Sequence, residues 1–248
     1  MYKDVLIISD NFYLCKGFLE IIERKKIPNC FFTFSISSFS NKEDFNVLNH
    51  DIKVFDLKKQ KHIDYIKNNY DLIFSIHCKQ IFPVELTNHL KCINIHPGFN
   101  PINRGWYPQV FSIIKKMPIG ATIHEIDDKL DHGPIIERGL ITKNNFDTSE
   151  TLYNKILEKE LKLLENNIEN IINNNYNVIE PEDEGTLHLK RDFNELLELN
   201  LKEQVLVGDL IDRLRALTHG DFKNAYFIDP DTGKKIFVSI KLNPEDHE

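Results

Sequence analysis

The sequence lacks the motifs that mark several common kinds of site. It contains no Gly-x-Gly-x-x-Gly after its first apolar run, no His-Glu-x-x-His and no Gly-x-Ser-x-Gly. A dinucleotide site, a zincin-type metal site and a serine nucleophile elbow are therefore disfavoured. Cysteine is also scarce. Cys15, Cys30, Cys78 and Cys92 show no Cys-x-x-Cys spacing, and we expect them to be reduced core residues.

Long apolar runs and a surplus of basic residues are also missing. No stretch approaches the length of a membrane span, and the apolar run at residues 5–8 is too short for a signal peptide. The 38 acidic and 31 basic residues give a formal net charge of −7, without the basic stripe of a nucleic-acid-binding protein. We expect a cytoplasmic protein with no membrane or nucleic-acid partner. A nucleotide ligand needs only one or two local cations and stays open.

What the sequence does contain is a regular alternation of short apolar runs and helical spacing. Alternation of this kind predicts a doubly wound, mostly parallel α/β sheet. The predicted strands cover residues 5–8, 30–36, 54–56, 72–76, 92–96, 120–126 and 135–141. The predicted helices cover residues 14–25, 62–68, 83–90, 108–116 and 147–173.

The composition changes after residue 180. Residues 181–185 read Pro-Glu-Asp-Glu-Gly and predict a linker, and residues 207–217 predict an amphipathic helix. Two apolar runs at 225–228 and 235–240 flank a turn and predict a β-hairpin. Because an isolated hairpin is marginal, it must pack on the main domain, on a partner subunit or on both. We expect a main domain over 1–180 and a small helix-plus-hairpin appendage over 181–248.

One strand carries the residues best suited to chemistry. Asn94 and His96 are two positions apart, so they share a strand face just before Pro97-Gly98 stops the strand. An amide can stabilise an oxyanion and a histidine can move a proton. Asp127, Asp128 and Asp131 in a nearby loop offer an orienting carboxylate. The alternatives are a hydrogen-bonded strand end, a solvated turn, or a metal site that adds His124 and His132.

The loop after this strand is shaped by prolines and glycines. It holds Arg104, Trp106 and Tyr107. An arginine and two aromatic rings indicate a binding site for an anionic, partly flat ligand.

Taken together, the motifs resemble those of the N10-formyltetrahydrofolate-dependent formyltransferases. The resemblance covers about residues 1–175 and rests on Asn94-Ile95-His96-Pro97, on Gly120-Ala121-Thr122-Ile123-His124 and on Leu130-Asp131-His132-Gly133. The loop at 100–109 is similar to that of the branch that formylates nucleotide-linked amino sugars. So are Leu214-Arg215-Ala216-Leu217-Thr218 and Asn224-Ala225-Tyr226-Phe227 in the tail.

The resemblance implies roles for individual residues. Asn94, His96 and Asp131 match the catalytic trio, which selects Asp131 from its neighbours. The formyl donor would be N10-formyltetrahydrofolate, with no metal. Its pterin would lie over the carboxyl ends of the strands, near Lys79, Ile81 and the loop from Ile126 to Asp128.

The resemblance also implies a substrate and an assembly. The acceptor would be the amine of a dTDP-linked amino-dideoxyhexose, at C3 or C4, for O-antigen or another surface polysaccharide. Arg215 would meet a pyrophosphate, and Phe222 or Tyr226 would stack on a base; core packing is the alternative for all three. The short tail predicts a homodimer through the hairpin rather than a tRNA-binding barrel.

Three other functions stay open at this point. A deformylase would use water in place of the amine, a non-catalytic relative would only bind a nucleotide sugar, and a glycinamide-ribotide enzyme would share the trio. Trp106 and the arginine-bearing loop favour a bulky acceptor over water. The intact trio argues against a binding protein, and the C-terminal extension argues against the glycinamide-ribotide branch.

Overall fold

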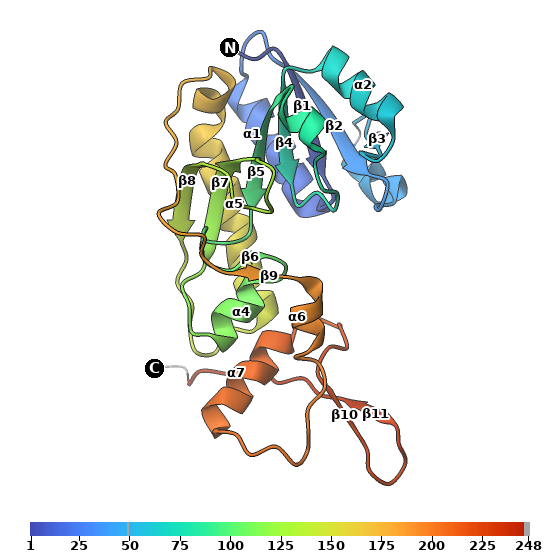
Figure 1. Cartoon of the computed structure of the whole chain (residues 1–248), viewed down its shortest axis with the longest axis vertical. Coiled ribbons are helices and arrows are strands. Elements are labelled where there is room, and N and C mark those ends of the chain that lie inside the picture. The colour runs from blue at the N-terminus through green and yellow to red at the C-terminus, as the bar shows by residue number, and fades with distance from the viewer. Residues whose placement is uncertain (49, 246–248) are drawn as a thin grey trace.

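The computed structural model describes residues 1–48 and 50–245, which fold around a seven-stranded sheet (Figure 1). The strand order is β3-β2-β1-β4-β5-β7-β8. The first five strands in this order are parallel, whereas β7 pairs antiparallel with both β5 and β8. The strands are β1 (Asp4–Ser9), β2 (Phe31–Ser37), β3 (Lys53–Phe55), β4 (Leu72–Ile76), β5 (Lys91–His96), β7 (Gly120–Glu125) and β8 (Ile135–Leu140). The prediction of a mostly parallel α/β sheet is confirmed.

Helices cover both faces of the sheet. Alternate residues of β1 point to opposite sides, so Val5 and Ile7 pack in one core while Leu6 and Ile8 pack in another. The first core is closed by α1 (Phe12–Lys25) and by α5 (Ser149–Ile172). The second is closed by α2 (Gln60–Asn69) and α3 (Val84–Thr87). This double covering explains why the parallel strands read as nearly continuous apolar runs.

A third core joins the C-terminal part of the chain to the sheet domain. It lies below the sheet in Figure 1, where α4 (Pro108–Ile114) and the start of α5 meet α7 (Val207–Leu217). Leu152 and Ile156 of α5 pack there with Phe193 and Leu217. The hairpin of β10 (Tyr226–Ile228) and β11 (Lys235–Phe237) extends beyond this core. The C-terminal segment is thus anchored by shared apolar contacts.

The structure departs from the sequence prediction in short elements. The helix predicted over 83–90 is one turn, α3, and the one predicted over 108–116 ends at Ile114. The prediction missed the 3₁₀ helix η1 (Lys42–Leu48), α6 (Lys190–Asn194), and the bridge between β6 (Arg104–Gly105) and β9 (Leu187–His188). Two-residue strands carry no periodicity, because a tertiary contact alone defines them. No helix in the described ranges is long and apolar enough to cross a membrane.

Candidate active site

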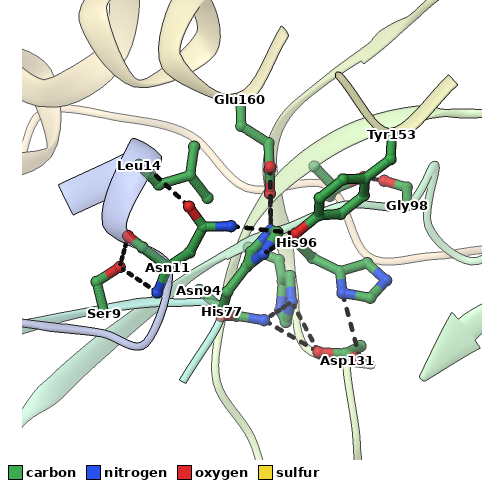
Figure 2. Close-up of polar contacts among 12 residues, drawn as sticks. Ser9, Asn11, Leu14, His77, Asn94, His96, Gly98, Asp131, Tyr153 and Glu160 are labelled. Atoms are coloured by element: carbon green, nitrogen blue, oxygen red, sulfur yellow. Dashed lines mark hydrogen bonds and ion pairs between the residues drawn. The ribbon is translucent and has the colours of Figure 1, made fainter. Parts of the chain in front are cut away.

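Three predicted residues meet at the carboxyl end of β5 (Figure 2). Asn94 and His96 come from β5, and Asp131 comes from the loop between β7 and β8. Asn94 Nδ2 donates to Asp131 Oδ1 at 3.0 Å, and His96 Nδ1 lies 3.4 Å from Asp131 Oδ2. Residues 37 positions apart in the chain therefore form one polar cluster.

The His96 imidazole is buried and neutral. Its side chain is 4% exposed, and burial lowers the pKa of His96 to about 4 even though Asp131 opposes the shift. Asp131 lies on the Nδ1 side, so the proton of the neutral ring belongs on Nδ1 and the lone pair on Nε2. At neutral pH this places a free base at Nε2.

His96 Nε2 points into space kept open by a glycine. A Cβ built on Gly98 would lie 2.5 Å from this nitrogen, so no other residue fits there without displacing the ring. Within the described ranges, Nε2 is buried without a hydrogen-bond partner. Buried polar atoms are nearly always paired, so an unpaired one at a strand end indicates a ligand site.

Asp131 stays ionised although it is largely buried. Burial alone would raise its pKa, but His96, His124 and the Gly105 N–H lower the pKa of Asp131 to about 2. The Gly105 amide donates to Oδ2 at 3.2 Å. Asp131 therefore serves as a fixed carboxylate that orients His96.

Asn94 has a second partner that the sequence did not indicate. Its Nδ2 also donates to His124 Nε2 at 3.1 Å, because His124 Nδ1 is used in donating to the Glu125 carbonyl. Both amide hydrogens of Asn94 are thus engaged. The bond to Asp131 is charge-assisted and stronger, so the bond to His124 is the one that a developing oxyanion can share.

Arg104 anchors the loop that carries Asp131. The arginine is 6% exposed, and its Nη1 donates to the Leu130 carbonyl at 3.0 Å while its Nη2 lies 3.4 Å from Glu184. The predicted direct grip of Arg104 on an anionic ligand does not fit this placement. The short β6 strand directs the Arg104 side chain toward the Leu130 carbonyl, so that Arg104 positions the loop that carries Asp131.

Four residues near the site adopt the left-handed backbone conformation without being glycine. They are His77, Asn103, Tyr107 and Asp131, with φ between 48° and 54°. Such conformations cost free energy and persist where surrounding contacts impose them. For His77 and Asp131, the imposed conformation fixes the direction in which these polar side chains leave the backbone.

The residues predicted to hold the cofactor lie along the neighbouring loops. Ile81 is 85% exposed and Asp128 is exposed, whereas Ile126 is partly buried and its N–H donates to the Cys92 carbonyl. Lys79 is anchored through its N–H, which donates to Asp10 Oδ2 at 2.7 Å.

The two aromatic residues of the loop after β5, Trp106 and Tyr107, have different surroundings. Tyr107 packs on Phe193 with ring centroids 4.1 Å apart, so it belongs to the third core. Trp106 keeps 42% of its surface exposed, and Lys190 Nζ lies 5.7 Å from its ring. Trp106 is therefore the member of the pair that is open to a ligand.

The C-terminal candidates have three different surroundings. Arg215 is 3% exposed; it donates to Asp212 at 2.8 Å and to the Asp147 carbonyl at 2.8 Å. The predicted pyrophosphate contact of Arg215 does not fit this buried position. Tyr226 lies in the hairpin, away from β5, and its hydroxyl donates to Glu198. Phe222 is 72% exposed beside His219, at a centroid distance of 5.8 Å.

Sequence reasoning missed a second polar cluster beside His96. His77 follows β4, and Tyr153 and Glu160 lie on α5 (Figure 2). The sequence offered only two signals: a histidine, His77, at the end of another predicted strand, and a glutamate, Glu160, at an apolar position of the predicted helix 147–173. Neither identifies a partner. Within the described ranges, no group of three or more His, Cys, Asp or Glu side chains has the arrangement of a metal site.

Comparison with known proteins gives two family matches on this chain. The family described as "Formyl transferase" matches residues 22–168. The family described as "N-formyltransferase dimerization C-terminal domain" matches residues 192–244. The two matches fall on either side of the predicted linker.

Individual relatives agree with these families. The chain is 48% identical over 180 residues, 73% of this chain and 76% of the relative, to dTDP-4-amino-4,6-dideoxyglucose formyltransferase of Mycobacterium tuberculosis H37Rv. A solved 4-N formyltransferase from Francisella tularensis is 40% identical with a TM-score of 0.92, covering 98% of this chain and 99% of that one. A sugar N-formyltransferase from Shewanella sp. has the same coverage, a TM-score of 0.93 and 37% identity.

Proposed function

The chain belongs to the formyl transferase family, and we propose that it transfers a formyl group from N10-formyltetrahydrofolate to the 4-amine of a dTDP-linked 4-amino-4,6-dideoxyhexose. The observation that carries the reaction type is the meeting of Asn94, His96 and Asp131 around a buried imidazole nitrogen that has no hydrogen-bond partner among the described residues. The choice of the 4-amine rests on the relatives, two of which are named for 4-amino or 4-N formylation.

His96 is suited to the proton that leaves the attacking amine. When an amine adds to a formyl carbon, its nitrogen becomes positively charged and strongly acidic. A neutral imidazole of low pKa can accept that proton at Nε2 and then return it to the departing nitrogen. Asp131 holds the ring through Nδ1 and stabilises the transient imidazolium.

Asn94 is suited to the developing oxygen charge. Its Nδ2 sits between Asp131 and His124, so the hydrogen given to His124 can be shared with an oxyanion. One such donor is worth about 2.7–4 kcal/mol in the transition state. Asp131 meanwhile fixes the amide so that its oxygen cannot turn toward the carboxylate.

The residues at the edge of the sheet fit the folate donor. Among the described residues His96 Nε2 has no hydrogen-bond partner, and Asn94 lies two positions before it on β5, so we place the formyl group between these two side chains. Lys79, Ile81, Ile126 and Asp128 are the candidates for pterin contacts, mainly through their backbone. When bound, the donor supplies the electrophilic formyl carbon; the chain supplies the acid, the base and the orientation.

Two exposed aromatic rings, those of Trp106 and Phe222, are the candidates for contacts with the acceptor. Trp106, with Lys190 beside it, and Phe222, next to His219, are open to a nucleotide. Aromatic faces bind flat bases, and a nearby lysine favours a diphosphate. A role in O-antigen or surface polysaccharide synthesis, and a cytoplasmic location, stay predictions.

We further propose that two chains associate through the C-terminal segment. The matching family model is described as a dimerization domain. Its residues expose many large apolar side chains, and such a surface is typical of an interface. They include Leu201, Leu206, Val207, Ile228, Ile236 and Phe237.

The proposal is tested by incubating the protein with N10-formyltetrahydrofolate and a panel of dTDP-linked 3-amino and 4-amino dideoxyhexoses, read by mass. We expect a gain of one formyl group on a 4-amino sugar alone. His96→Ala should lose at least about 100-fold in kcat while keeping its affinity for both ligands.

Other outcomes of this experiment contradict the proposal in distinct ways. Formylation of a 3-amino sugar alone would show that the acceptor is the 3-amine and not the 4-amine. Consumption of the donor without a formylated sugar would indicate a deformylase. Binding without any turnover would indicate a non-catalytic relative.

A further inference from the structure

A hydrogen-bonded chain of three side chains runs beside the catalytic trio. Tyr153 Oη lies 3.1 Å from His77 Nδ1, and His77 Nε2 lies 2.9 and 3.0 Å from the two carboxylate oxygens of Glu160 (Figure 2). Glu160 is 0% exposed. We propose that Tyr153, His77 and Glu160 form a proton relay that deprotonates the ammonium group of the acceptor sugar before it attacks. This inference rests on the proposed function.

The position of the relay follows from the sheet. Ile76 of β4 pairs with Ile95 of β5, so the next residues, His77 and His96, leave the same edge of adjacent strands. His77 has a φ of 51°, which turns its side chain toward α5 rather than along the strand. Tyr153 and Glu160 are seven residues apart on α5, so they share one helix face and meet His77 together.

In the proposed relay Glu160 is a carboxylate, and this sets the directions of the hydrogen bonds. An ionised Glu160 can only accept, so His77 donates from Nε2 and its Nδ1 lone pair accepts the Tyr153 O–H. Tyr153 Oη also accepts from Asn11 Nδ2 at 3.1 Å. A phenolic oxygen has two lone pairs, so one is left for an N–H donor of the ligand.

The reaction requires such a base in addition to His96. A sugar amine flanked by oxygen-bearing carbons has a pKa of about 8, like an α-amino group, so it is mostly ammonium at pH 7. An ammonium has no lone pair with which to attack. His96, whose pKa is lowered to about 4, is too weak to accept its proton.

The proposed step conserves atoms and charge. An ammonium N–H bond breaks and its proton bonds to Tyr153 Oη as the Tyr153 proton passes to His77 Nδ1. The neutral amine is released, Tyr153 stays neutral, and the His77 imidazolium is stabilised by Glu160. The proton returns to solvent after the formamide has left, matching the one proton that formylation of an ammonium releases.

Several titratable groups surround the relay and belong to its environment. Burial raises the pKa of Glu160, and His77 opposes that shift; burial also raises the pKa of Tyr153 to about 12, so the phenol relays a proton without ionising. His219 packs against the Tyr153 ring at 5.5 Å. The other groups facing His77 are His96, Cys78 in its own loop, and Asp10, which binds that loop through the Lys79 N–H.

The test compares Tyr153→Phe and Glu160→Gln with wild type by kcat/KM for dTDP-4-amino-4,6-dideoxyglucose at pH 6.5 and pH 9, with saturating formyl donor. Both variants keep the shape of the site, and glutamine can still accept from His77. We expect each to lose about 30-fold at pH 6.5, where about 3% of an amine with a pKa of about 8 is free, and less than fivefold at pH 9, where free amine is abundant. Tyr176→Phe removes a comparable half-buried hydroxyl, which donates to Glu125 away from the site, and should lose nothing.

If Tyr153, His77 and Glu160 only stabilised the fold, the kcat/KM values of the two variants would follow a different pattern with pH. Losses of the same factor at both pH values, or no loss at pH 6.5, would overturn the relay while the enzyme remains a formyltransferase. Absence of any formylated sugar with the wild-type protein at both pH values would instead overturn the proposed function, and the relay with it.

Discussion

At the scale of single residues, the site separates two imidazoles by their surroundings. His96 is buried, with a carboxylate beside Nδ1 and no partner for Nε2 in the part of the chain that the structure describes, and burial makes it a weak, neutral base. His77 has a buried carboxylate on one nitrogen and a phenol on the other. The two imidazoles therefore differ in the groups with which each can exchange a proton.

The burial of His96 has a consequence for stability. Its pKa in the folded protein, about 4, is below the ordinary value of 6.5, so between these values the unfolded chain binds a proton that the folded protein excludes. The free energy of unfolding should therefore fall as the pH falls from 6.5 to 4, by up to about 1.4 kcal/mol per pH unit from this group.

Urea titrations at several pH values check this expectation. His96→Leu should remove that part of the pH dependence, whereas His89→Leu at an exposed position should leave it unchanged. If the free energies of unfolding of wild type and His96→Leu fall in parallel between pH 6.5 and 4, the result would contradict a buried, neutral His96.

At the scale of elements, one arginine adds polar contacts to the apolar packing between α7 and the start of α5. Arg215 donates to Asp212 on its own helix and to the Asn144 and Asp147 carbonyls before α5. Since α5 carries Tyr153 and Glu160, this contact links the C-terminal segment to the site. Removing Arg215 would take this donor away from the Asp212 carboxylate and from two backbone carbonyls at a buried position.

We expect Arg215→Met to lower the free energy of unfolding by about 3 kcal/mol. Arg191→Met, at a side chain that is 77% exposed, should change it by less than about 0.5 kcal/mol. Chemical denaturation measures both. Unchanged stability together with a raised KM for the nucleotide sugar would instead make Arg215 a substrate contact.

At the scale of the whole molecule, apolar surface is concentrated in the C-terminal segment. The hairpin is a two-stranded sheet in which Ile236 and Phe237 are 41% and 45% exposed. Their neighbours across the hairpin are Phe227 and Tyr226. A two-stranded sheet with exposed apolar residues is stable only when something covers it.

The double variant Ile236→Lys with Phe237→Lys should shift the protein from dimer to monomer, because it places charges in the proposed interface. Light scattering of eluting fractions measures the mass. Phe31→Lys, at a side chain that is 69% exposed on β2, is the control and should stay dimeric. A wild type that is monomeric at all concentrations tested would contradict the interface.

The sequence by itself predicted the strands of the sheet and placed Asn94 and His96 together as candidate catalytic residues. Apolar runs fix strands because each buried strand must be apolar on both faces, and Asn94 and His96 share a face because side chains alternate along a strand. Only the family resemblance separated Asp131 from Asp127 and Asp128. The C-terminal helix was also predicted, because Val207–Leu217 has a clear helical period.

Only the tertiary structure decided which side chains are open to ligands and which are paired. Arg104 and Arg215 look like anion-binding residues in sequence, yet both are buried in hydrogen bonds to backbone carbonyls from distant loops. The partnership of His77 with Glu160 joins residues 83 positions apart. No local pattern records such a pair, because its energy comes from burial and geometry that exist only after β4 and α5 have packed together.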